Sequence, residues 1–131
     1  MSTLVCNRNE SNIEFEQQAK EIVMFLLKNS HRFPKSTRFI YHTKLLELSY
    51  SLLENVEYSQ AVYFIDKKSK IFYVQKALGC LNTLEILWNI VHKTYEQQIS
   101  VGLHEELSRH ILLEREKLLA LLKSLRAKVI R

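Results

Sequence analysis

The sequence predicts an all-α fold, an antiparallel up-down-up-down four-helix bundle. The chain has 131 residues, the size of one domain, and its hydrophobic fraction of 47% is enough for a packed core. Two glycines and one proline are too few for the many turns of a sheet protein. Four stretches with apolar residues at helical spacing are joined by short polar breaks, which force neighbouring helices to run in opposite directions. We expect a flexible N-terminus over 1–11 and one bundle domain over 12–131.

The first helix is expected over residues 12–31, because the sequence at 11–14, SNIE, fits a capping box. Phe33 and Pro34 should end it, since a proline disfavours helical geometry at the residue before it. The second helix is expected over 37–65. Its end stays open, because the apolar run YSQAVYFI also fits an extended strand.

The third helix, expected over 71–95 after a polar connection at 66–70, has too many apolar residues for a helix with one wet face. One stripe, which includes Leu81, Leu84, Trp88 and Val91, has the spacing of a core face. We expect this helix to be central in the bundle and to be buried again by another subunit.

A second stripe on the third helix, with extra leucines on the fourth helix (103–130), would be an exposed apolar patch in a monomer. We therefore expect these side chains to contact another copy of the chain. The expected oligomer-interface residues are Phe72, Gly79, Thr83, Ile86, Ile90, Leu112 and Leu119.

The formal net charge is +5, and residues 1–65 contribute none of it. A basic excess favours polyanions such as nucleic acid, or an acidic protein surface. The predicted topology gathers the positive side chains into two tips that could contact phosphates, although helix ends also commonly carry solvated lysines. The expected RNA- or protein-binding residues are Lys67, Lys68, Lys70, Arg126, Lys128 and Arg131 at one tip, and Arg32, Lys35 and Arg38 at the other. Aromatic residues near the first tip either stack on unpaired bases or complete the core: Tyr63, Phe64, Phe72 and Tyr73.

No catalytic or metal-binding motif stands out. The sequence lacks the Glu-x-x-His pairs of di-iron bundles, zinc-ligand spacing among its five histidines, and a phosphate-binding glycine loop. We expect no enzyme activity, no metal and no cofactor. Arg38 and His42 come close to the Arg–His pair of helical ribonucleases of the HEPN class, with one residue too few between them, which leaves a ribonuclease as an alternative.

The location expected from the sequence is cytoplasmic. Cys6 and Cys80 form no disulfide framework, which suits a reducing compartment. The first residues lack the pattern of a signal peptide, and no apolar run is long enough to span a membrane. No membrane partner is expected.

Three stretches carry a resemblance to a known family: RFPKSTRFIYHTKLLELSYSLLENVEYS, ALGCLNTLEILWNIV and QQISVGLHEELSRHILLEREKLLALLKSL. Over about residues 15–128 the chain resembles the Avd-type four-helix-bundle proteins, the accessory variability determinants of diversity-generating retroelements. It is also similar to the small four-helix proteins encoded in intervening sequences of bacterial 23S rRNA genes. Residues 117–122 depart from the Gly-Arg and Gly-Gly-Trp-Ile sequences often found in related chains.

The resemblance implies a non-enzymatic accessory protein that forms a homopentameric ring with a basic surface. Such a protein binds the retroelement's reverse transcriptase and its template RNA, with DNA as a further candidate, and supports mutagenic cDNA synthesis. The alternative partner is the RNA bound by the intervening-sequence proteins. A ring would also multiply weak basic contacts into useful avidity.

Overall fold

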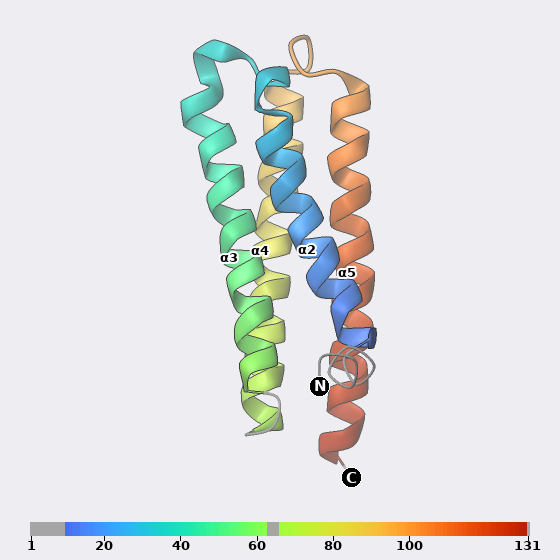
Figure 1. Cartoon of the computed structure of the whole chain (residues 1–131). Coiled ribbons are helices and arrows are strands. Elements are labelled where there is room, and N and C mark those ends of the chain that lie inside the picture. Colours follow the sequence, from blue (N-terminus) through green and yellow to red (C-terminus); the bar gives the residue numbers. More distant parts are fainter. Residues whose placement is uncertain (1–9, 63–65, 131) are drawn as a thin grey trace.

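The computed structural model describes residues 10–62 and 66–130, with side-chain surroundings for 14–36, 38–62 and 66–127. This part of the chain holds four long helices and no strand, as the sequence predicts: α2 (Glu10–Lys28), α3 (Thr43–Ala61), α4 (Lys67–Thr94) and α5 (Val101–Ile130). Figure 1 shows them side by side in one bundle. The α2–α3 and α4–α5 connections lie at one end, and the end of α3, the start of α4 and the last turns of α5 lie at the other end.

The helices pack as a ring of four rather than around a central helix. α4 packs against α3 and α5, and α2 packs against the same two helices. The expectation that α4 is central is therefore wrong, because α4 occupies a corner of the bundle and keeps one face in solvent. Its predicted core stripe is nevertheless buried: Val74, Ala77, Leu78, Leu81, Leu84, Trp88 and Val91. Burial of each large apolar side chain contributes roughly 1.5–3 kcal/mol.

The connection between α2 and α3 breaks at Pro34, as predicted, but it is longer than expected. α2 ends at Lys28 instead of residue 31, and α3 is α-helical from Thr43 instead of residue 37. Between them lie two 3₁₀ turns and a π-helical turn: η1 (Ser30–Arg32), η2 (Lys35–Thr37) and η3 (Arg38–His42).

Side chains that satisfy the last carbonyls of α2 explain why that helix ends early. Asn29 Nδ2 donates to Phe25 O at 2.9 Å, and His42 Nε2 donates to Leu26 O at 2.7 Å. The Leu26 carbonyl would otherwise lack a partner at the helix end, whereas Phe25 O also accepts from the Asn29 backbone N at 3.0 Å. Phe33 is buried against the edge of the His42 ring, with ring centroids 4.7 Å apart, and so holds the connection onto the bundle.

α4 begins four residues before its predicted start, because residues 67–70 are already helical, and α3 ends at Ala61 where the sequence predicted residue 65. Asp66 caps α4: Oδ1 accepts from the Lys68 backbone N at 3.0 Å, and Oδ2 accepts from Ser69 Oγ at 2.8 Å. This cap satisfies a free donor of the first turn, so the helix begins at Lys67 rather than residue 71. Both hydrogen bonds also hold the pKa of the Asp66 carboxyl below its usual value. Tyr63 and Phe64 lie outside the described residues.

Ser100 sets the start of α5. Its Oγ accepts from the Leu103 backbone N at 3.0 Å, so the helix begins at Val101, two residues before the predicted start. Trp88 joins the two helices from inside the core, where it is fully buried and donates from Nε1 to His104 O at 3.2 Å.

Candidate nucleic-acid interface

The first predicted tip retains two of its lysines at the start of α4. Lys67 and Lys68 are exposed in the first helical turn. Lys76 is also exposed, and its Nζ lies 5.4 Å from the ring centroid of Phe72, a favourable cation–π distance. We call the set Lys67, Lys68, Phe72 and Lys76 the α4 basic surface. It combines ammonium groups that can pair with phosphates and an aromatic ring that is 53% exposed.

Lys70, placed at the same tip by the sequence, is not on the surface. Only 1% of the residue is exposed, and its Nζ donates to Ser59 O at 3.2 Å. Burial lowers the pKa of this ammonium group to about 8. Lys70 repeats at helical spacing with Val74 and Ala77 of the core stripe, so its stem enters the bundle and the prediction that it contacts RNA is corrected.

The other predicted members of this tip come from the last residues of the chain. Figure 1 shows the last turns of α5 at the same end of the bundle as the start of α4. Arg126 is exposed there. Lys128 lies in the helix with its side chain outside the described set, and Arg131 lies outside the described residues.

The second predicted tip is less basic at its surface than the sequence suggests. Arg32 pairs with Glu106 of α5, Nη2 to Oε1 at 3.5 Å, and donates from Nη1 to Asn29 Oδ1 at 3.1 Å. Arg38 donates from Nη2 to Phe33 O at 3.2 Å. These two guanidinium groups tie the α2–α3 connection together, whereas Lys35 is exposed.

The Arg38 and His42 pair has structural contacts instead of a catalytic arrangement. His42 is 6% exposed, and its Nε2 hydrogen bonds to a backbone carbonyl of α2. Arg38 is directed to a different carbonyl, that of Phe33. In the part of the chain that the structure describes, no group of three histidine, cysteine, aspartate or glutamate residues could hold a metal ion.

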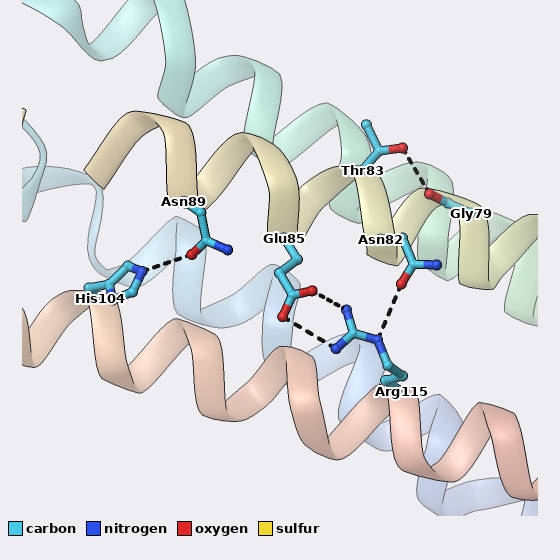
Figure 2. A network of polar contacts seen from close by, with 7 residues as sticks. All are labelled: Gly79, Asn82, Thr83, Glu85, Asn89, His104 and Arg115. Carbon is cyan, nitrogen blue, oxygen red and sulfur yellow. Dashed lines mark hydrogen bonds and ion pairs between the residues drawn. The ribbon is translucent and has the colours of Figure 1, made fainter. Parts of the chain in front are cut away.

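A polar seam fixes α4 against α5, as Figure 2 shows. Arg115 forms a bidentate pair with Glu85: Nη2 lies 2.6 Å from Oε1, and Nη1 lies 3.3 Å from Oε2. Its Nε also donates to Asn82 Oδ1 at 3.2 Å. Further along, Asn89 Oδ1 and His104 Nε2 lie 3.0 Å apart. The seam holds the outer faces of both helices in one fixed register.

The predicted interface residues flank this seam and face solvent. Apolar members of the set are about half exposed, and Gly79 and Thr83 are exposed on the same stripe of α4. The exposed apolar members are Phe72 (53%), Ile86 (60%), Ile90 (56%), Leu112 (50%) and Leu119 (48%). We call these residues, with Gly79 and Thr83, the α4–α5 outer face. Val101 at 64% exposure was not predicted.

Two carboxyl groups with raised pKa values were not predicted from the sequence. Glu114 is fully buried on the core face of α5, and neither carboxyl oxygen has a hydrogen-bond partner among the described residues. Burial raises its pKa to about 9. Between α2 and α3, a hydrogen bond with Glu16, together with burial, raises the pKa of Glu57 to about 7. Glu114 lies at core spacing with Ile111 and Leu118, a signal that the sequence does contain.

Comparison with known proteins leaves the chain without an assigned family. No protein-family model matches it, and no curated protein matches it significantly. Among the described helices, none is both long enough and apolar enough to cross a membrane.

Proposed function

We propose that this protein is a non-enzymatic accessory factor of a diversity-generating retroelement. In this proposal, up-down-up-down bundles assemble into a homopentameric ring that binds the reverse transcriptase and template RNA and supports mutagenic cDNA synthesis. The resemblance of residues 15–128 to Avd-type proteins suggests the role. The observation that carries it is the joint presence, on α4, of an exposed basic surface and an exposed apolar stripe.

The distribution of charge supports assembly between unlike faces. α2 and α3 carry seven acidic and three basic residues, whereas α4 and α5 carry eleven basic and five acidic residues. One half of the bundle is therefore complementary to the other half of a second copy. A contact between two different faces leaves each copy with one unused face that can bind a further copy. The copies form a closed ring when the rotation from each copy to the next returns to the first copy.

The test of assembly uses two matched variants. Light scattering of the wild-type protein is expected to give a pentamer, and Ile86→Lys with Ile90→Lys should give monomers that remain helical by circular dichroism. Ile40→Lys is the control, because Ile40 is 72% exposed in the α2–α3 connection, at an end of the bundle and not on the helix faces proposed to meet. A wild-type monomer, or a pentamer unaffected by the double substitution, would contradict the proposed assembly.

RNA binding is tested by charge reversal on the α4 basic surface. Lys67→Glu with Lys68→Glu should weaken RNA binding. It should also make the slope of log affinity against log salt concentration shallower, by about one for each phosphate that the variant no longer neutralises. The control is Lys20→Glu with Arg109→Glu, the same change of charge at exposed sites of α2 and α5 away from this tip. Equal effects of both pairs would show that only net charge matters.

The partner is tested by copurification with the reverse transcriptase encoded nearest to the gene. A neighbouring reverse-transcriptase gene with paired template and variable repeats selects the retroelement function. A gene that lies inside a 23S rRNA gene selects the intervening-sequence proteins, with their RNA as the ligand.

A further inference from the structure

The α2–α3 connection presents two neighbouring apolar side chains to solvent. Phe39 is 87% exposed and Ile40 is 72% exposed, the highest values among the large apolar residues described. Both lie in the π-helical turn η3, at one end of the bundle (Figure 1). Single exposed apolar side chains are common, but here two are adjacent, and they lie on a π-helical turn, a backbone form that is frequent at functional sites.

The turn beneath this pair is firmly held. The next two residues, Tyr41 and His42, are 4% and 6% exposed. His42 is fixed by its hydrogen bond to Leu26 O and by its T-shaped contact with the Phe33 ring. Tyr41 stacks on Tyr95, with centroids 5.2 Å apart. Phe39 and Ile40 are thus displayed on a packed support, which reduces the entropy cost of binding a ligand.

An exposed lysine precedes the exposed pair along the chain, and another follows it. Lys35 lies in the preceding turn and Lys44 in the first turn of α3, and both are exposed. Lys44 Nζ lies 3.7 Å from Glu47 Oε2, with both side chains at least 60% exposed. Such a solvated pair is weak, so the ammonium group remains able to contact a phosphate.

A protruding aromatic ring with lysines on both sides matches the chemistry of unpaired nucleotides. Every base offers a π face for stacking, and the backbone places a phosphate on each side of it. A double-stranded helix hides its base faces, so it could use the lysines but not the ring. The arrangement therefore favours a single strand over a duplex.

We propose that Phe39 is a stacking platform for an unpaired base of single-stranded RNA, with Lys35 and Lys44 contacting the flanking phosphates. This inference rests on the proposed function for the class of ligand. It adds a second contact point at the end of the bundle opposite to the α4 basic surface.

The direct test is fluorescence of a Phe39→Trp variant. The natural Trp88 is fully buried and gives a constant background, whereas an indole at position 39 is solvated. Titration with a uridine oligonucleotide of about ten nucleotides should quench the new emission, and an RNA duplex of equal length should not. If a saturating concentration of the oligonucleotide does not quench the emission of the new tryptophan, the proposal is overturned.

The affinity test uses Phe39→Ala, which should weaken binding of the oligonucleotide by about 5- to 150-fold, the range for removal of one base–aromatic stack. Binding of the duplex should not change. Tyr50→Ala is the control, because Tyr50 is 46% exposed on α3 between Glu47 and Glu54 and should leave both affinities unchanged.

Three outcomes would count against the inference in different ways. If Lys67→Glu with Lys68→Glu weakens RNA binding and Phe39→Ala does not, the stacking platform is wrong and the proposed function survives. If the wild-type protein binds no RNA at low salt, both are wrong. If Phe39→Ala changes the sedimentation coefficient of the assembly and leaves RNA affinity intact, the pair is a protein contact and stacking is overturned.

Discussion

Replacement of Glu114 by leucine is expected to stabilise the protein by about 3 kcal/mol at pH 7. The folded protein raises the pKa of this buried carboxyl from 4.5 to about 9, so the group must keep its proton on folding. Between an unfolded pKa of 4.5 and pH 7, that proton costs about 1.4 kcal/mol per pH unit. Leucine removes this cost and fills the site with apolar atoms.

The sign of the pH dependence follows from the raised pKa of Glu114. Below pH 4.5 the Glu114 carboxyl is protonated in both the folded and the unfolded protein, so it does not change the free energy of unfolding. As pH rises from 4.5 towards 9, the unfolded protein loses this proton while the folded protein keeps it, and the free energy of unfolding falls. The advantage of Glu114→Leu over wild type should therefore be under about 1 kcal/mol at pH 5 and about 5 kcal/mol at pH 8. The difference in stability between Glu114→Gln and wild type should change with pH in the same way, but without the added gain from apolar packing.

The assay is urea unfolding at pH 5, 7 and 8, followed by the fluorescence of Trp88, the single tryptophan of the chain. Protein concentration is kept fixed, because assembly of folded copies adds to apparent stability. Other titrating groups are common to both proteins and cancel in the difference. A difference that stays constant from pH 5 to pH 8 would refute the assignment of a neutral, buried carboxyl.

Three further changes probe the contacts between helices. The raised pKa of Glu57 means that the wild-type protein loses stability as pH rises through 7, and Glu57→Gln should remove this part of the loss. The urea midpoints of both proteins at pH 5.5 and 8 measure it. If both midpoints change by the same amount between the two pH values, the prediction is wrong. His42→Phe keeps the ring but removes the donor to Leu26 O, and calorimetry should show a loss of about 1–3 kcal/mol for the unpaired carbonyl, unlike the small change expected of a surface histidine. A double-mutant cycle of Arg115→Ala and Glu85→Ala should give a coupling of up to about 1 kcal/mol, because the pair is partly solvated; a coupling near zero would leave the seam without an energetic role.

The helices could be predicted from periodicity, and their ends could be predicted only in part. Pro34 marked the first break, because it acts on the backbone locally. The end of α2 depends on His42, which reaches back from the following turn, and such a contact is invisible in a local pattern. The start of α4 could have been read from Asp66, a good N-cap residue that was instead taken as part of a polar loop.

The candidate site was harder to predict because charge was counted without regard to helical phase. Lys70 and Glu114 are ionisable residues at core spacing, and their phase would have placed both inside the bundle. Phe39 and Ile40 could not have been found in this way. A π-helical turn shifts the register of the following residues, so that the apolar spacing on either side no longer shows which side chains face solvent.

The packing of each helix against its neighbours in sequence has a kinetic consequence. The α3–α4 and α4–α5 contacts can form by closure of short connections, whereas the α2–α5 contact joins distant parts of the chain, as in the hydrogen bond between Gln18 and His110, 92 residues apart. Loop closure costs more entropy for the longer separation. We expect the α2–α5 contact, which completes the bundle, to form late in folding. Substitutions at Gln18 should then accelerate unfolding with little effect on the folding rate.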